Sequence, residues 1–448
     1  MARGRSSSNL GADIPGDTSA PAMSTMNEVS PIETDAPKWD KPEVSQSSEK
    51  SLKSQSKRRK SRSLLRRFKD KCLKHTWLLP LLMLIVLLAL YAVNPNPSNP
   101  LHSAIFLSYP QGPKTPGGPV MYGKGPKDIA FVSFYTIVLS FTREFIMQRI
   151  IRPWAIYCGI RGKGKTARFM EQVYTAIYFG IFGPFGLYVM YRSDIWYFNT
   201  TAMYEGFPHR EHEALFKAYY LLQASYWAQQ AIVLLLQLEK PRKDFKELVG
   251  HHIITLALIA LSYRFHFTYM GLAVYITHDV SDFFLATSKT LNYLDSFITP
   301  PYFGMFVGMW IYCRHYLNLK ILWAVLTEFR TVGPFELNWE TQQYKCWISQ
   351  YITFALLASL QAVNLFWLFL ILRILKNYVF NSIRKDERSD DEDTEEEEEA
   401  EQEQNGRATL ATGAQVPTVT ARNIGKENQA PQVLVNGEPL NEKSSSRR

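Results

Sequence analysis

The chain has 448 residues, of which 46% are hydrophobic and 20% are charged, and its formal net charge is +9. The charge is segregated, because residues 53–74 hold a dense Lys/Arg block whereas residues 386–403 are almost wholly Asp and Glu. The four cysteines form no CxxC pair, so neither a disulfide framework nor a zinc site is indicated. Polar ends around an apolar centre instead suggest a membrane protein.

The N-terminal region changes character along its length. Residues 1–50 are rich in Ser, Pro, Asp and Glu without apolar periodicity, and we expect them to be disordered. The basic block that follows leads directly into the apolar run Trp77–Val93. Positive charge beside a hydrophobic span stays cytosolic, so membrane anchoring is favoured over nucleic-acid binding. The run lies too far along the chain for a cleaved signal peptide.

Seven further apolar runs follow, each close to the roughly 20 residues that cross a hydrocarbon core of about 30 Å. They cover residues 129–147, 174–191, 218–238, 245–263, 267–288, 300–326 and 351–375. We therefore predict an all-α polytopic membrane protein with about eight transmembrane helices (six to eight), which form a catalytic bundle between disordered cytosolic ends.

The loops test this topology, because those on the cytosolic side should be basic. With a cytosolic N-terminus these are the loops after even-numbered spans, and Lys and Arg do gather after the second, fourth, sixth and eighth runs. Both termini are therefore predicted to be cytosolic. Arg314, His315 and Lys320 depart from the pattern, because they fall inside or beyond the seventh run. Either that span is shorter than drawn, or part of it faces the bundle interior.

Two modification sites are predicted outside the spans. Asn199 opens the sequon Asn199-Thr200-Thr201 in a loop that this topology makes lumenal, so we expect its glycosylation. Ser389 precedes Asp390-Asp391-Glu392 in the acidic tail, which suits phosphorylation by an acidophilic kinase. The tail itself is expected to be a solvated extension.

The segment Gly159–Thr166 matches the phosphate-loop pattern G-x-x-x-x-G-K-[ST]. That motif binds nucleotides where it follows a buried strand and opens a helix, whereas here it joins two predicted membrane spans. A nucleotidase is therefore disfavoured. The basic side chains and the glycine-rich backbone still favour an anionic cytosolic ligand.

His209 and His212 have the HxxH spacing of some metal ligands. A di-iron membrane oxygenase needs several such histidine boxes on one membrane face, and the whole chain has nine histidines. This pair falls in a predicted lumenal loop, away from the other candidate histidines. We therefore interpret both as exposed loop residues, and no metal site is expected.

Five ionisable residues lie within the fifth and sixth apolar runs, namely His251, His252, His278, Asp279 and Asp282. A charged group at membrane depth costs about 2.5–3.5 kcal/mol on insertion scales, so such groups are read as functional by default. A turn near Arg264–Phe267 would make the two runs an antiparallel hairpin, with residues 251–252 level with 278–279. The five residues can therefore meet near the cytosolic surface.

Histidines with carboxylates suit acyl transfer. A neutral imidazole is a base and a nucleophile near physiological pH, and a carboxylate that accepts from one ring nitrogen fixes its tautomer. The set does not suit a zinc protease, because HExxH is lacking. The alternative is a polar network that only holds helices together. Interhelical hydrogen bonds in membranes average only about 0.6 kcal/mol, which poorly explains five ionisable groups.

The same residues resemble the longevity-assurance motif of eukaryotic ceramide synthases. The resemblance runs from His251-His252-Ile253 through Tyr263-Arg264-Phe265 and Gly271 to His278-Asp279-Val280-Ser281-Asp282, then Lys289 and Asn292-Tyr293. Arg168-Phe169-Met170-Glu171 resembles the start of the family's membrane domain, although Gln172 stands where Ser is usual. Phe329–Trp339 and Trp347–Trp367 resemble its end in fungal members. The homeobox-like insert of animal relatives is not seen, which indicates the fungal type.

The resemblance implies an endoplasmic reticulum enzyme that transfers a long or very long fatty acyl group from acyl-CoA to the amine of dihydrosphingosine or phytosphingosine. It implies His251 and His252 as the catalytic pair, Asp279 and Asp282 as their acidic partners, and His278 in support. Which histidine takes which role stays open. Acyl-CoA is then a co-substrate, and no cofactor is expected. We expect its phosphates near Arg161, Lys163, Lys165 and Arg168.

The resemblance also implies a small single-span regulatory subunit, dimers with itself or a paralogue, contact with membrane lipids, and acyl-length selection near residues 329–346. No nucleic-acid partner is expected. The alternatives are a non-catalytic TLC-domain protein for lipid sensing or translocation, which should lack the paired histidines and Asp-x-x-Asp, and a transporter, which should show internal repeats.

The predicted domains follow the spans and the charge blocks. They are a disordered basic cytosolic region (1–75), the first transmembrane helix with a lumenal loop (76–128), the second transmembrane helix with a basic cytosolic loop (129–164), a TLC catalytic membrane domain (165–380) and a disordered acidic cytosolic tail (381–448).

Overall fold

A computed structural model describes residues 66–67, 69–72, 74–236 and 244–381, together with strands β4 (Leu434–Val435) and β5 (Glu438–Pro439). The chain divides into two units, Met1–Lys71 and Cys72–Arg448, and the described part of the first is helical. The predictions of disorder for residues 1–50 and of a solvated acidic tail, and the phosphorylation site Ser389, lie outside the described residues.

The second unit is built from long helices. In chain order they are α3 (Leu78–Val93), α5 (Lys127–Ile146), α7 (Lys163–Tyr191), α8 (Ala214–Leu235), α9 (Phe245–Arg264), α10 (Thr268–Tyr293), α11 (Thr299–Trp310) and α13 (Trp347–Asn381). Two π-helical segments extend helices without a break: η3 (Met147–Ile151) leads from α5 into α6 (Arg152–Tyr157), and η5 (Ile311–Leu317) leads from α11 into α12 (Asn318–Thr327). Within the described residues, each predicted apolar run falls on one of these helices, and the seventh run spans α11, η5 and α12.

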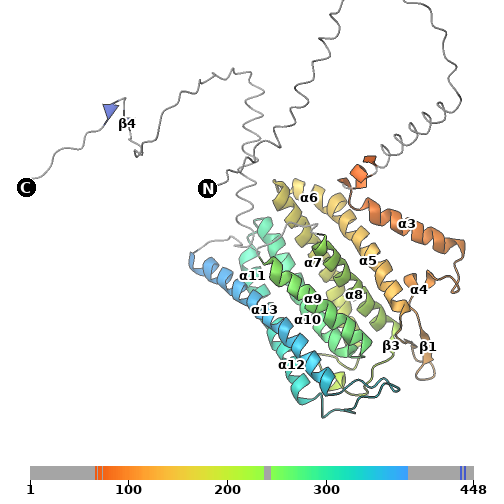
Figure 1. The fold of residues 1–448 in the computed structure, drawn as a ribbon. Helices are drawn as coiled ribbons and strands as arrows, with labels where there is room; N and C mark the ends of the chain where they lie inside the picture. The colour runs from red at the N-terminus through yellow and green to blue at the C-terminus, as the bar shows by residue number, and fades with distance from the viewer. Residues whose placement is uncertain are drawn as a thin grey trace, which may run out of the picture. The chain divides into compact units, whose positions relative to one another are not determined.

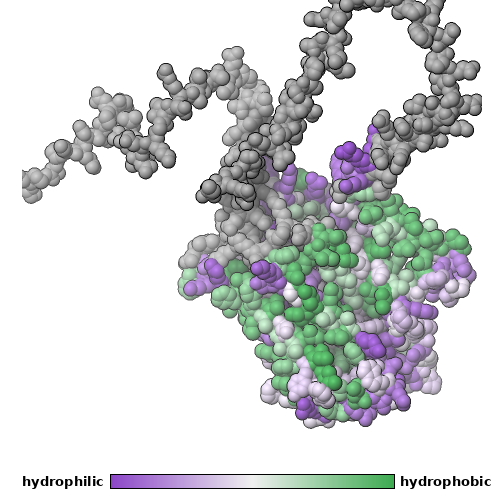
Figure 2. Space-filling model, in the orientation of Figure 1, coloured by the Kyte–Doolittle hydropathy of each residue, from purple (hydrophilic) through white to green (hydrophobic). Residues whose placement is uncertain are grey.

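Four helices within the described ranges are long and apolar enough to cross a membrane, namely Lys127–Tyr157, Lys163–Tyr191, Phe245–Arg264 and Trp347–Phe380, and Leu78–Val93 is a shorter apolar helix. Helices α8 and α10 are as long but carry buried polar side chains such as Gln223 and Asp279, which lower their hydropathy. Figure 2 shows hydrophobic residues over the bundle and polar residues gathered toward its ends. The chain is therefore an all-α polytopic membrane protein, as the sequence predicts.

Helices dominate because a bilayer core provides no water to satisfy backbone N–H and C=O groups. Helix α10 lies inside the bundle and packs against α7, α9, α11 and η5 (Figure 1). Helix α13 packs against α9 and α12, while α5 packs against α8 and α3. Side chains on α10 therefore meet neighbours from several helices, which makes it the element best placed to organise a buried site.

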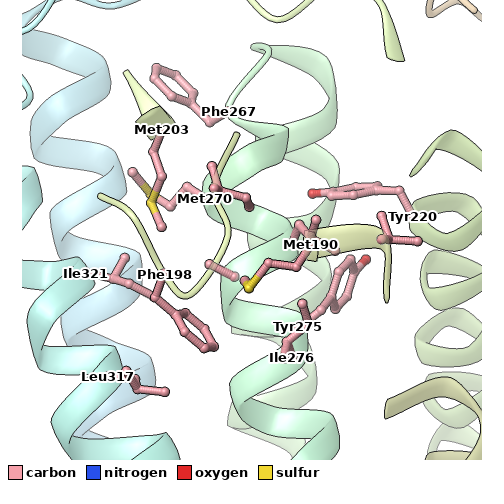
Figure 3. Packing of buried hydrophobic residues seen from close by; sticks show 14 of the residues in the cluster. Met190, Phe198, Met203, Tyr220, Phe267, Met270, Tyr275, Ile276, Leu317 and Ile321 are labelled. Atoms are coloured by element: carbon pink, nitrogen blue, oxygen red, sulfur yellow. The ribbon is translucent and has the colours of Figure 1, made fainter. Parts of the chain in front are cut away.

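The main apolar core surrounds the first half of α10. There Met270, Tyr275 and Ile276 pack with Tyr220 of α8 and Met190 of α7 (Figure 3). The Tyr220 side chain of α8 reaches the backbone of α10 at Gly271, where a Cβ would collide with the Tyr220 hydroxyl. Tyr219 and Gln223 of α8 reach α10 in the same way, and both donate to Asp279.

A small sheet closes one end of the second unit. Strands β1 (Pro110–Pro113), β2 (Val120–Tyr122) and β3 (His212–Glu213) pair antiparallel in that order, beside the short helix α4 (His102–Ile105). Lys217 at the start of α8 anchors this cap, because its ammonium pairs with Asp128 of α5 at 2.7 Å. The same ammonium donates to the carbonyls of Ser108 and Gly123 at 2.9 and 2.7 Å.

We predict that Lys217→Met destabilises the protein by about 3–5 kcal/mol, because it leaves the Asp128 carboxylate buried without its cation. Denaturant or thermal unfolding of the purified protein in detergent measures the change. Replacing both partners, with Lys217→Met and Asp128→Leu together, should recover part of the loss. Arg192→Met is the matched control. It breaks the solvent-exposed pair with Glu213, which water and salt screen, and should destabilise the protein far less. Equal losses in the two single variants would contradict the prediction.

Candidate active site

The α9–α10 hairpin brings the histidines together. Helix α9 ends at Arg264 and α10 begins at Thr268, so the chain reverses at the predicted turn. The ring centroid of His251 lies 5.8 Å from that of His252 and 6.4 Å from that of His278. All three rings are buried. The hairpin therefore aligns residues 251–252 with residue 278, as the sequence predicts.

Two tryptophans enclose this histidine cluster. The indole of Trp227 on α8 meets His251 and His252 edge-on, with centroids 5.7 and 5.9 Å away. The indole of Trp367 on α13 lies 5.1 Å from the His251 ring and donates its N–H to Asp244 at 3.2 Å. The cluster is thus held between α8 and α13 by apolar surfaces that restrict water.

The hydrogen bonds identify the proton-bearing nitrogens, because a carbonyl oxygen only accepts. Nδ1 of His252 donates to the carbonyl of Leu248, and Nδ1 of His278 donates to that of Val274, both at 2.9 Å. His251 differs. Its Nε2 lies 3.5 Å from the Thr255 hydroxyl, and its Nδ1 is buried without a hydrogen-bond partner among the described residues.

The two aspartates point to different helices. Asp279 accepts a hydrogen bond from the Tyr219 hydroxyl of α8 at 2.7 Å and another from the Gln223 amide. Asp282 forms an ion pair of 2.5 Å with Arg314 of η5. Residues three apart on a helix are rotated by about 60°, enough to face separate neighbours. The contacts that place these carboxylates are therefore with a tyrosine, an amide and a guanidinium.

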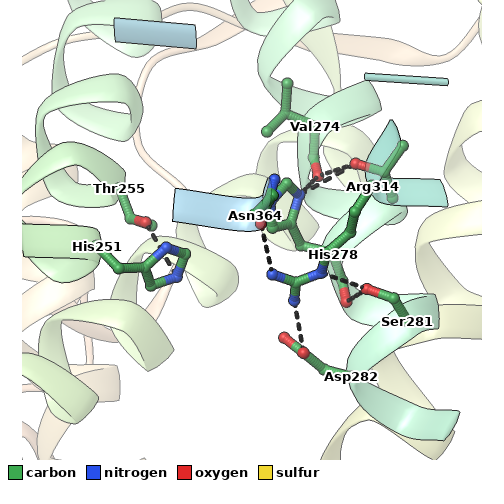
Figure 4. Close-up of polar contacts among 9 residues, drawn as sticks. His251, Thr255, Val274, His278, Ser281, Asp282, Arg314 and Asn364 are labelled. Carbon is green, nitrogen blue, oxygen red and sulfur yellow. Dashed lines mark hydrogen bonds and ion pairs between the residues drawn. The ribbon is translucent and has the colours of Figure 1, made fainter. Parts of the chain in front are cut away.

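Arg314 is the site residue that the sequence left unassigned. It is 2% exposed, so the seventh run does face the bundle interior at this point. Its guanidinium also donates to the Ser281 hydroxyl at 2.7 Å and to the Asn364 amide oxygen at 3.0 Å (Figure 4). An arginine within an apolar run was the available signal. The sequence carried no comparable signal for three other residues of the site, because a single uncharged polar residue in a span forms no spacing pattern. These are Asn364, Tyr219 and Gln223.

An apolar cavity of about 230 Å³ extends from the histidines between α9, α10 and α13. His251 and His278 line it together with Thr255 and Val274, and its lining continues past the hairpin turn at Phe265. It also reaches the segment before α13, at Leu337, Trp339 and Tyr344. His252 is not among the described residues that line it. The cavity can hold a linear apolar chain with one end at His251.

The basic residues proposed for phosphate binding lie at the start of α7. Gly162, with φ 93°, precedes the helix, and Lys163, Lys165 and Arg168 fall in its first two turns. Arg161 and Lys163 are exposed. The helix α6, not a strand, leads into this segment. The strand–loop–helix context of a nucleotide-binding phosphate loop is therefore lacking around it.

The prediction that His209 and His212 are exposed is wrong. Both are buried, because the segment before α8 folds against α10. His209 stacks on Tyr269 with ring centroids 4.1 Å apart, and His212 stacks on Phe216 at 4.2 Å. In the described part of the chain no group of three or more His, Cys, Asp or Glu side chains is placed to hold a metal.

The sequon lies in the loop after α7. The side chain of Asn199 is exposed, whereas the hydroxyls of Thr200 and Thr201 donate to the Glu328 carboxylate at 2.9 and 3.0 Å. The asparagine amide is therefore accessible, and the two hydroxyls that follow it hold the loop against the end of α12.

Comparison with known proteins agrees with this architecture. The TLC domain family matches residues 168–373. The chain is 55% identical over 321 residues to ceramide synthase LAG1 of Saccharomyces cerevisiae, covering 71% of this chain and 77% of that protein. It is 52% identical over 341 residues to sphingosine N-acyltransferase lac1 of Schizosaccharomyces pombe, covering 75% and 87%. A sphingosine N-acyltransferase-like protein of Gibberella moniliformis, FUM17, is 55% identical over 324 residues, covering 71% and 84%.

An all-α membrane bundle that buries a histidine cluster at the end of an apolar cavity, together with the match over α7 to α13, defines a TLC-domain membrane protein. Within this class the chain belongs to the ceramide synthase family, whose fungal members are also named sphingosine N-acyltransferases. The resemblance stated from the motif residues is thereby confirmed.

Two buried histidines lie outside the long helices, His209 in the segment before α8 and His266 in the turn between α9 and α10, and they predict that stability depends on pH. Burial lowers the pKa of His209 to about 4 and that of His266 to about 3, against about 6.5 in an unfolded chain. Below pH 6.5 the unfolded state takes up protons that the folded state does not, so stability should be complete above about pH 6.5 and fall as the pH approaches 4. Thermal unfolding in detergent across this range measures it. His209→Phe keeps the stacked ring and should reduce the loss. An unchanged pH profile in this variant would contradict the assignment.

Proposed function

We propose that this protein is a ceramide synthase that transfers a long or very long acyl group from acyl-CoA to the amine of dihydrosphingosine or phytosphingosine. The observation that carries the proposal is the apolar cavity that ends at His251. It suits an acyl chain whose thioester lies against an imidazole. The names of the fungal relatives describe the same reaction for those proteins.

His251 is the proposed nucleophile, because it is the member of the His251–His252 pair that lines the cavity. A ring nitrogen attacks the thioester carbonyl, the C–S bond breaks, and CoA leaves with a proton as the free thiol. The resulting acyl-imidazole is then attacked by the neutral amine. A C–N bond forms and the imidazole leaves, so an amide is released and His251 is regenerated.

His252 is the proposed base that takes the proton lost by the amine and returns it to the departing ring of His251, so both imidazoles end neutral. Its Nδ1 donates to the Leu248 carbonyl, so in the neutral ring the lone pair is on Nε2. The ring lies 5.8 Å from His251, close enough to serve an amine that attacks an acyl group there. Acyl-CoA is the only co-substrate in this scheme. A thioester is already activated toward amines, and no resident cofactor is required.

The aspartates act as positioning residues in this proposal. Asp279 holds Tyr219 and Gln223, and thereby the segment of α8 that carries Trp227 against both histidines. Asp282 holds Arg314, which reaches Asn364 beside His278. Each carboxylate thus reaches the histidine cluster through a second side chain.

The CoA portion is proposed to lie outside the cavity, with its phosphates near Arg161, Lys163, Lys165 and Arg168. Basic side chains at a helix N-terminus favour phosphate groups. This arrangement admits the acyl chain into the apolar interior while the charged carrier stays in water. The apolar cavity would thus hold the acyl chain of the substrate, and the basic residues would hold its CoA phosphates.

The cellular setting is proposed from the charge pattern and the family. We propose the endoplasmic reticulum membrane, with both termini cytosolic because the basic loops follow even-numbered spans. In that orientation Asn199 is lumenal and open to glycosylation, and Ser389 is cytosolic and open to phosphorylation. A small single-span regulatory subunit and dimers with itself or a paralogue complete the proposed partners.

Substitution of the catalytic pair tests the proposed chemistry. His251→Ala should lower ceramide formation by about a thousandfold or more, because it removes the nucleophile. His252→Ala should lower it by about 10²–10⁴-fold, the usual contribution of a general base. Release of free CoA by the purified protein with acyl-CoA and dihydrosphingosine measures both. Full activity of either variant would overturn its assigned role.

Intact-protein mass spectrometry separates the two roles. With acyl-CoA and no amine, wild type and His252→Ala should both gain the mass of one acyl group, whereas His251→Ala should gain none. An acyl adduct retained in His251→Ala but lost in His252→Ala would exchange the roles of the two residues.

Substitution of a cavity residue tests the selection of acyl length. Ile259 lines the cavity on α9, eight residues and about 12 Å beyond His251 along the helix axis. Ile259→Phe should fill this part of the cavity and shift the products toward shorter acyl chains, at a stability cost of about 1–3 kcal/mol. Competition among acyl-CoAs of different length, with products resolved by mass spectrometry, measures the shift. Ile253→Phe is the control, because this side chain of the same helix is 65% exposed. An unchanged product distribution in Ile259→Phe would exclude the cavity as the acyl site.

A further inference from the structure

A continuous line of buried polar contacts connects three elements beside the cavity. Asp282 of α10 pairs with Arg314 of η5, Arg314 donates to Asn364 of α13, and Asn364 contacts His278 of α10 (Figure 4). Arg314 and Asn364 are 2% and 0% exposed. Neither lines the cavity, so neither is placed to touch a substrate there. Their effect on the reaction has to pass through His278.

Arg314 is held rigidly. Its Nε and both terminal nitrogens donate to Ser281, Asn364 and Asp282, and the guanidinium lies 4.2 Å from the centroid of the Trp310 ring. A guanidinium presents donors in a fixed planar fork, so these contacts together define its orientation. The π-helical turn of η5 carries it, and such turns are frequent at functional sites.

This rigid donor fixes the orientation of the Asn364 amide. A guanidinium only donates, so the amide must present Oδ1 to Arg314, at 3.0 Å. Its Nδ2 is then turned toward Nε2 of His278, at 3.4 Å. If the amide were rotated by 180°, its NH2 group would face the N–H group of Arg314, and two donors would meet without an acceptor. The charge of Arg314 therefore decides that His278 faces a donor.

A donor beside Nε2 selects one form of His278. Nε2 must accept, so the ring proton is on Nδ1, which donates to the Val274 carbonyl at 2.9 Å. Both nitrogens are then used and the ring is neutral. In this form its ring lies beside that of His251, with the centroids 6.4 Å apart and the ring planes at 25°. A protonated ring would place an N–H against the Asn364 amide donor.

We propose that Arg314 and Asn364 are positioning residues that lock His278 as the neutral Nδ1–H tautomer, so that it packs against His251 without taking a proton. This inference rests on the proposed acyl transfer at His251. It assigns His278 to the support of the nucleophile and leaves proton transfer to His252. It also gives Asp282 a function, which is to hold the arginine that orients the amide.

A double-mutant cycle tests the proposal. Asn364→Leu removes the donor and should lower kcat by about 10–100-fold, the scale of loss when a reacting group is misplaced, with little change in KM for acyl-CoA. His278→Phe keeps a flat ring that needs no donor. In a His278→Phe background, Asn364→Leu should therefore cost almost no further activity. Additive losses would show that Asn364 acts independently of His278 and would overturn the proposal.

Asn318→Leu is the matched control. Asn318 of α12 is also buried, at 1% exposure, and its amide donates at 2.8 Å to Gln361, which lies on α13 as Asn364 does. It makes no contact with His278. Its replacement also removes a buried amide, but the hydrogen bond that is lost leads to Gln361, so kcat should stay within about threefold of wild type. A loss of kcat equal to that of Asn364→Leu would mean that losing any buried asparagine in this part of the bundle has the same effect, which contradicts the proposal.

A spectroscopic measurement tests the tautomer directly. In ¹⁵N NMR of histidine-labelled protein, the His278 signals are those lost in His278→Phe. They should show a protonated Nδ1 and an unprotonated Nε2. Asn364→Asp still accepts from Arg314 but presents an acceptor to His278, so Nε2 should become protonated. An Nε2 that is already protonated in wild type would overturn the proposal.

The outcomes separate this inference from the proposed function. Wild-type protein that releases no CoA, or His251→Ala with full activity, defeats the proposed function whatever the cycle gives. Active wild type with an additive cycle, or with the wrong tautomer, defeats only the positioning role of Arg314 and Asn364.

Discussion

The ion pair between Arg314 and Asp282 is the constraint on which the buried site depends. A guanidinium in the interior of a membrane bundle is stable only beside a carboxylate and with its donors satisfied. The partners of the guanidinium lie on other helices: Asp282 and Ser281 on α10, and Asn364 on α13. Arg314 itself is on η5, so pairing its charge requires these three elements to pack together. The electrostatics of one side chain thereby fixes how three helices meet beside the histidines.

The same helices supply polar side chains to the histidine cluster and mainly apolar side chains to the cavity. On α9, one turn carries His251 and His252, while the turns that follow present Thr255 and Ile259 to the cavity. Trp227 lines the cavity beside His251, and Trp367 of α13 meets the same imidazole. An acyl chain and a reacting thioester need these surroundings side by side. The hairpin supplies both within a few turns.

The far end of the bundle is stabilised by charges that take no part in the proposed reaction. Lys217 and Asp128 join α8, α5 and the loop of the small sheet, and the cap thereby closes the end of the second unit away from the histidines. His209 and His212, which their spacing alone made candidates for a metal, serve this cap as stacked and neutral rings. Polar residues thus stabilise the fold at one end of the second unit, and those at the other end are the ones proposed to react.

The sequence by itself determined the long apolar helices, the reversal near residue 265 and the meeting of His251 with His278, because hydropathy, helical rise and a short turn are local properties. It also supplied the family, through the spacing of the motif. Only the tertiary structure decided that Asp279 turns to α8 and Asp282 to Arg314, that His209 and His212 are buried, and that His251 rather than His252 lines the cavity. These outcomes depend on which neighbour each helix face meets. That is set by packing between residues such as Arg314 and Asn364, which are 50 positions apart in the chain.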